Sequence, residues 1–321
     1  MQSTTIKKLF FRFLGSDMAG MIITVFVMLV GFAIAIPNFF LPASLLNILI
    51  MSSTMGLVAI GESYLIIAGQ IDLSPGALSA FSGVFVGILL AAGFHPLLAI
   101  LCVLLFGMLV GVFNSVLVNF LKLQPFIATL AAMSLLRGFA FIINNGESIA
   151  IKEPRFLLLN TARFLEISLS VWILVIALIM FTIILKTTVF GRNVYIIGGN
   201  PNAARLAGIS NKKIITVLYM INSTLAALGG ITLAARLNSG QPTASQGLEF
   251  DAITAAVLGG IAFSGGKGSM FGTILGIFIL QGFTNGLLMF GMPHFWQHVA
   301  RGALLVLALS FDTIRSYIQK R

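Results

Sequence analysis

The side chains that could do chemistry are sparse, because only 9% of the 321 residues are charged. Asp72 and Ser74 lie in the segment GQIDLSPG, residues 69–76, which separates two apolar runs. These side chains could cap a helix by accepting backbone N–H groups, or they could line a path for a polar solute. Glu62 lies within the preceding apolar run, where an ionisable group is costly unless it is paired or faces water.

Uncharged amides inside other apolar runs form a second set of candidates. Gln281 and Asn285 lie one helical turn apart, in a run that also holds pairs of glycines four residues apart. Such glycine pairs allow close helix packing, and amides hydrogen-bond across the contact. Amides also suit a ligand with many hydroxyl groups, and Asn114 and Asn222 would belong to the same set. Both interpretations stay open.

Arg137 and Arg301 are cations within predicted spans. We expect each to snorkel to the interface or to pair with Glu62, Asp312 or a backbone carbonyl.

No metal or phosphate site is predicted. The three histidines lie at predicted span ends, without acidic or thiol partners at ligand spacing. The glycine-rich stretch 259–269 departs from a phosphate-binding loop, because Ile261 stands where the first glycine belongs and Gly268 where Ser or Thr belongs. We expect a tight turn there.

The composition assigns the chain to the polytopic membrane proteins. Hydrophobic residues make up 58% of the sequence and the mean hydropathy is +1.06, whereas a soluble domain is about 25% charged. The net charge of +10 lies in short segments beside the apolar runs, where it sets topology rather than binding nucleic acid. A single cysteine, Cys102, excludes an intrachain disulfide.

The apolar runs predict an all-α fold of about ten transmembrane helices with both termini in the cytoplasm, built as one domain over residues 1–321. The predicted spans cover residues 18–36, 45–68, 77–93, 96–120, 125–143, 167–185, 214–235, 252–263, 270–290 and 298–311.

The longest basic interruption, residues 191–213, holds four cations and no acid, so we place it in the cytoplasm. Pro201 is suited to a first helical position, and the following residues favour a helix that ends at Gly208. The pattern predicts a short cytoplasmic helix between two spans.

Five segments in the same order closely resemble the permease subunits of bacterial ribose-type ABC sugar importers. They are AGQIDLSPGA (68–77), QPFIATLAAMSLLRG (124–138), GRNVYIIGGNPNAARLAGI (191–209), GQPTASQGLEFDAITAAVLGG (240–260) and GGKGSMFGTILG (265–276). The resemblance implies an ABC importer permease in the bacterial inner membrane, paired with a second copy or a paralogue. It also implies a periplasmic sugar-binding protein and cytoplasmic ATP-binding subunits, which would hold ATP and Mg; the permease itself is not an enzyme and has no cofactor.

The resemblance also implies roles for particular residues. The ATPase-coupling helix would comprise Gly199, Asn200, Ala203, Ala204, Arg205 and Gly208. The substrate pathway would comprise Gln70, Asp72, Ser74, Asn114, Asn222, Gln281 and Asn285, and the receptor would dock at Gln241, Glu249 and Asp251. Gln70 and Pro75 depart from the glycine and valine that are usual in this family, so the identity of the sugar stays open.

Two other functions remain. A branched-chain amino acid ABC permease would share the topology and the coupling loop. An ion-coupled secondary transporter would need membrane carboxylates such as Glu62 and Asp72 for coupling.

Overall fold

The computed structural model describes residues 30–32, 34–36 and 38–319 and is mostly helical. Six helices of this part of the chain are long and apolar enough to cross a membrane. They are α3 (Pro42–Ile67), α5 (Pro96–Asn119), α6 (Pro125–Ile142), α8 (Leu169–Thr187), α11 (Asn211–Leu237) and α13 (Met270–Met289). Each matches a predicted span within a few residues. Of the first predicted span, 18–36, only residues 30–32 and 34–36 are described.

The described residues form further elements. The other helices are α4 (Pro75–Ala91), α7 (Pro154–Thr161), α9 (Val189–Gly199), α10 (Pro201–Leu206), α12 (Leu248–Leu258) and α14 (His294–Gln319). Strand β1 (Ile149–Ala150) pairs antiparallel with β4 (Ser239–Gly240), and β2 (Arg163–Phe164) pairs with β3 (Ile167–Ser168).

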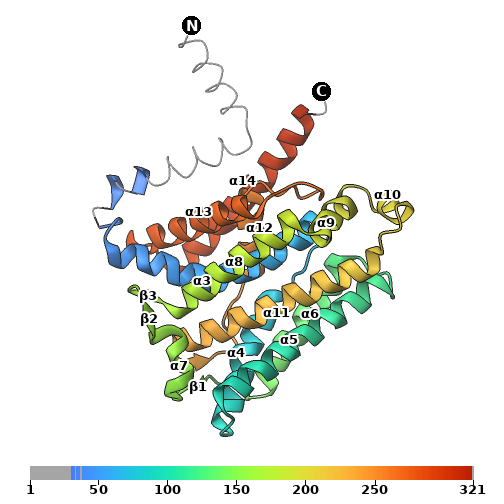
Figure 1. Ribbon diagram of the computed structural model, residues 1–321. Helices are drawn as coiled ribbons and strands as arrows, with labels where there is room; N and C mark the ends of the chain where they lie inside the picture. The colour runs from blue at the N-terminus through green and yellow to red at the C-terminus, as the bar shows by residue number, and fades with distance from the viewer. Residues whose placement is uncertain (1–29, 33, 37, 320–321) are drawn as a thin grey trace.

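Helix α11 is the centre of the bundle and contacts α3, α4 and α5. Figure 1 shows α9 and α10 at one end of the bundle, and α7 with β1, β2 and β3 at the opposite end. Glycines permit the close approach of α11 to its neighbours: a methyl group at Gly111 of α5 would collide with the Tyr219 carbonyl, and one at Gly230 would collide with the Ser79 carbonyl.

Helices α4 and α12 both begin inside the bundle, after breaks in the chain. Helix α3 ends at Ile67, and the chain then doubles back, so that Asp72 shares a hydrogen-bond donor with Glu62, one and a half turns before the end of α3. Proline at residue 75 starts α4 at this depth, because proline suits a first helical position. Helix α4 then runs to the β1 end, where Gly87 packs against Ile149.

The second break, residues 238–247, enters from the opposite end of the bundle. Gly240 pairs with Ile149 there, and the chain descends until the Ser245 carbonyl lies against Gly76 at the start of α4. Arg137 of α6 holds this segment, because its Nη1 donates to the Pro242 and Ala244 carbonyls at 2.9 and 2.8 Å. The expectation that Arg137 binds a backbone carbonyl is confirmed.

Helix α12 starts beside the first turn of α4 and runs to the α9 end. Its 11 residues span about 17 Å, which is short of a hydrocarbon core of about 30 Å. The predicted span 252–263 therefore corresponds to a half-length helix. The turn that follows is tight, with positive φ at Gly265 and Gly266, as the sequence predicts.

We expect Gly276→Ala to lower the free energy of unfolding by about 1–3 kcal/mol, because a methyl group there would collide with the Ala255 carbonyl of α12. Thermal unfolding of the purified protein in detergent measures the change. Gly138→Ala is the matched control, because its Cβ would meet open space. Equal melting temperatures for the two variants would contradict this packing.

Candidate functional site

A buried polar cluster joins α3, the first break, α5 and α11. Asn222 of α11 donates from Nδ2 to Glu62 Oε1 at 3.0 Å and to Asp72 Oδ2 at 3.2 Å. Asn114 of α5 donates to Asp72 Oδ2 at 3.3 Å and to Ser74 Oγ at 2.9 Å. All five side chains are fully buried. The structure thus brings together four of the seven predicted pathway residues, and adds Glu62.

Asp72 also organises the start of α4. Its Oδ1 accepts from the Ser74 N–H at 2.8 Å and from Ser74 Oγ at 2.6 Å, which satisfies donors that the break would otherwise leave unpaired. Within the described residues neither Glu62 nor Asp72 forms a salt bridge with Lys or Arg. Among the alternatives for Arg137 and Arg301, pairing with Glu62 does not occur, because Asn222 Nδ2 binds Glu62 Oε1 instead.

The other three predicted pathway residues lie elsewhere. Gln70 donates to the carbonyl of its neighbour Gly69, at the α9 end of α3. Gln281 donates to Met55 Sδ at 2.9 Å, and Asn285 donates to Ser44 Oγ at 2.9 Å. Both amides therefore hydrogen-bond from α13 to α3, as expected for groups that join helices. The seven residues do not line one cavity.

A hollow of about 360 Å³ lies between α3, α11, α12, α13 and α14, beside the second break. Its polar lining includes Thr54, Arg236, Gln241, Ser245, Gln246, Asp251, Gln281, Thr284, His298 and Arg301. Arg301 Nη1 and Asp251 Oδ2 form an ion pair at 2.7 Å, with both side chains largely buried. Asp251 is a partner that the sequence did not indicate for Arg301, whereas the bond from Arg301 Nε to the Gln297 carbonyl at 3.4 Å matches the expected carbonyl contact.

Two predicted receptor-docking residues occupy interior positions. Glu249 and Asp251 lie in the first turn of α12, where Glu249 is 4% exposed and packs against Gly76. The predicted spans 214–235 and 252–263 left these residues in a connecting loop outside the membrane, and this position is corrected because the chain descends into the bundle before α12 begins. Gln241, the third residue, lines the hollow. The sequence analysis missed Arg236, although its place at the end of a predicted span was a usable signal.

The predicted short helix after Asn200 is confirmed as α10. Asn200 Oδ1 accepts the Asn202 and Ala203 N–H groups at 3.0 Å each, and Gly208 has the positive φ of a helix-ending glycine. Arg205 and Leu206 are exposed, whereas Ala204 is buried. The residues before α10 form a second helix, α9, which was expected to be loop.

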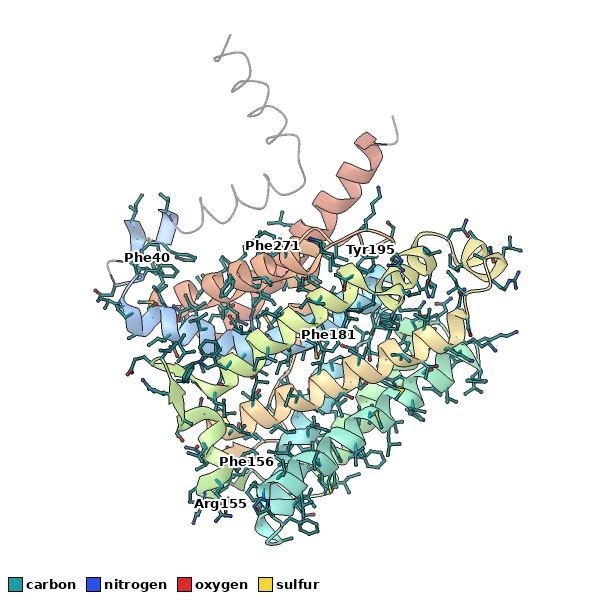
Figure 2. The ribbon with its side chains drawn as sticks, viewed as in Figure 1. Phe40, Arg155, Phe156, Phe181, Tyr195 and Phe271 are labelled. Atoms are coloured by element: carbon teal, nitrogen blue, oxygen red, sulfur yellow. The ribbon has the colours of Figure 1, made fainter. Side chains whose placement is uncertain are left out.

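Helix α9 contacts the first break and the α12–α13 turn. A methyl group at Gly198 would collide with the Ile67 carbonyl and approach the Gly266 N–H, and these two groups hydrogen-bond at 2.8 Å. Tyr195 donates to the Gly268 carbonyl at 2.8 Å, and Figure 2 shows Tyr195 at the opposite end of the bundle from Arg155 and Phe156. Burial raises the pKa of the Tyr195 phenol above its ordinary value, so this hydroxyl remains a donor at neutral pH.

No three His, Cys, Asp or Glu side chains are grouped to hold a metal ion among the residues that the structure describes.

We expect Asn222→Leu to lower the free energy of unfolding by about 1–3 kcal/mol, because it removes the donor shared by two buried carboxylates. Glu62→Gln should have a smaller effect, because the amide avoids burying a charge. Thermal unfolding in detergent measures both variants. A larger loss from Glu62→Gln than from Asn222→Leu would contradict the bridging role of Asn222.

Comparison with known proteins yields consistent matches along the chain. Residues 44–309 match the family model described as branched-chain amino acid transport system / permease component. The L-arabinose ABC transporter permease protein of Azospirillum brasilense is 33% identical over 297 residues, covering 92% of this chain and 88% of the relative. The ribose import permease protein of Bacillus subtilis is 36% identical over 299 residues, covering 92% and 93%.

The ribose import permease protein of Escherichia coli K12 is 37% identical over 280 residues, covering 86% of this chain and 87% of the relative. No solved structure matches the chain. A family match over residues 44–309, and relatives above 30% identity over most of their length, identify this multi-pass membrane protein as a member of the branched-chain amino acid transport system permease component family.

Proposed function

We propose that this chain is the membrane-spanning permease subunit of an ATP-driven bacterial importer, and that it carries a monosaccharide. The observation that carries the proposal is the similarity over about nine-tenths of the chain to permeases named for ribose and L-arabinose import. The permease is a transport subunit rather than an enzyme. ATP and Mg bind to separate or fused ATP-binding subunits, and a periplasmic binding protein delivers the sugar.

The topology proposed here has about ten transmembrane spans with both termini in the cytoplasm. Residues 191–213, which contain α10, face the cytoplasmic ATP-binding subunits, and residues 145–166 at the other end face the binding protein. The basic charge of α9, α10 and the start of α11 supports this orientation, because positive segments favour the cytoplasmic side. The working unit pairs this permease with a second copy or a paralogue.

Coupling would run through α9. A movement of α10 that is transmitted to α9 reaches Gly198, which packs against the end of α3, and Tyr195, which holds the α12–α13 turn. Helices α4 and α12, which both begin inside the bundle, are connected to these contacts. ATP and the loaded receptor would each favour a different conformation of the permease, and this difference in binding drives alternating access.

The first test is uptake by proteoliposomes that hold the complete transporter with its binding protein. We expect ATP-dependent accumulation of radiolabelled ribose or arabinose and none of leucine. ATP-dependent uptake of leucine alone would instead support an amino acid permease, which the description of the matching family favours. Uptake without the ATP-binding subunits would instead support an ion-coupled secondary transporter.

The coupling role of α10 has its own test. We expect Arg205→Glu combined with Gly208→Trp to abolish receptor-stimulated ATP hydrolysis and sugar uptake, because Arg205 is exposed on α10 and Gly208 ends this helix with a positive φ. Lys186→Glu, a charge reversal of an exposed residue at the end of α8, is the control and should leave both activities unchanged. Full receptor-stimulated hydrolysis in the double variant would refute the assignment.

A further inference from the structure

The hollow beside the second break has a helix terminus in its wall. Ser245, Gln246 and Leu248 line it, and they lie at the N-terminus of the 11-residue helix α12. Gly247 precedes the first turn with a φ of +78°, and this turn holds the carboxyl groups of Glu249 and Asp251. The N-terminal end of a helix carries a partial positive charge, which favours an electron-rich ligand atom, and Asp251 in this turn adds an acceptor that lines the hollow.

Gln281 gives independent support for a ligand at this position. Its side chain lines the hollow and is only 7% exposed, yet Oε1 has no hydrogen-bond partner among the described residues. A buried amide oxygen without a donor is costly, and a ligand hydroxyl in the hollow would supply that donor.

Charged groups on two other walls complete the set. Arg236 at the end of α11 lines the hollow and makes no hydrogen bond or ion pair within the part of the chain that the structure describes. Across from α11, Asp251 and Arg301 form their largely buried ion pair. The hollow therefore offers acceptors from Asp251 and Gln281 and donors from Arg236 and Arg301.

This arrangement suits a hydroxyl-rich solute better than an amino acid. Each sugar hydroxyl both donates and accepts, so neighbouring hydroxyls can use acceptors and donors together. The ammonium group of an amino acid would need a free carboxylate, whereas Asp251 is already paired with Arg301. A volume of about 360 Å³ falls within the usual range for small-molecule sites, and Met55 and Leu233 supply apolar contact for a sugar ring.

We propose that this hollow is the monosaccharide-binding site of the permease, in which Asp251 and Gln281 accept sugar hydroxyls while Arg236 and Arg301 donate to them. The proposal rests on the proposed function and identifies where the transported sugar is bound. It moves the site away from the Asp72–Asn222 cluster, which is fully buried. It also places Gln241 and Asp251, which the resemblance assigned to receptor docking, beside the transported sugar.

The test compares Gln281→Leu and Arg236→Met with the native chain in the complete transporter, reconstituted in liposomes with its binding protein. Uptake of radiolabelled ribose or arabinose should fall roughly tenfold in each variant, the effect of losing about one hydrogen bond. Receptor-stimulated ATP hydrolysis should stay within about twofold of native, because α9 and α10 are untouched, and a single symmetrical size-exclusion peak checks folding.

The selectivity of uptake among related sugars distinguishes a direct contact between Gln281 and the sugar from a structural role of Gln281. Uptake is also measured for deoxy analogues of the transported sugar, each lacking one hydroxyl. A lost acceptor at residue 281 should lower the preference for the parent sugar over one analogue roughly tenfold, whereas a general defect would slow both equally. Gln124→Leu, the same change at an exposed position, is the matched control.

The outcomes distinguish the two proposals. Sugar uptake by the native chain with unchanged rate and selectivity in both variants would overturn this site and leave the transport function intact. An equal loss of the parent sugar and every analogue would also overturn it. A native transporter that accumulates no sugar would overturn the proposed function and the site together.

Discussion

The structure depends on satisfying polar groups at two chain breaks inside a membrane-spanning bundle. Helices α4 and α12 begin beside one another in the interior, where unpaired backbone groups cost several kcal/mol each in hydrocarbon. At the first break, Asp72 accepts from the Ser74 N–H and hydroxyl. At the second, Arg137 binds two carbonyls. The first role of Asp72, Ser74 and Arg137 in the interior is therefore to satisfy backbone groups at these breaks.

The same two breaks connect the ends of the bundle. The first break begins at the end of α3, against Gly198 of α9, and it leads to the start of α4. The second break passes the hollow and leads through α12 to the turn held by Tyr195. A displacement of α9 would therefore act on the segments that lead to α4 and to α12 together. Close glycine contacts leave these two segments little room to shift independently of α9.

Most helices were predictable, because each apolar run is long enough to cross a membrane and proline or a polar turn marks its end. Helix α12 was less predictable. Its apolar residues continue through Gly259 and Gly260 toward Phe263, so hydropathy alone extends the run beyond the helix. Helix α9 was missed for the converse reason, because Arg192 and three glycines favour a loop by sequence alone, whereas the helix packs against α8 and α3 in the structure.

The sequence by itself determined the class of protein, the positions of the long apolar helices and the short helix after Asn200, because hydropathy and helix-capping signals act over a few neighbouring residues. Only the tertiary structure decided which polar residues meet. Asn222 reaches Glu62 and Asp72 because α11 packs between α3 and α5, and Asp251 meets Arg301 because α12 starts inside the bundle. These partners lie 50 to 160 residues apart, so no local pattern could pair them.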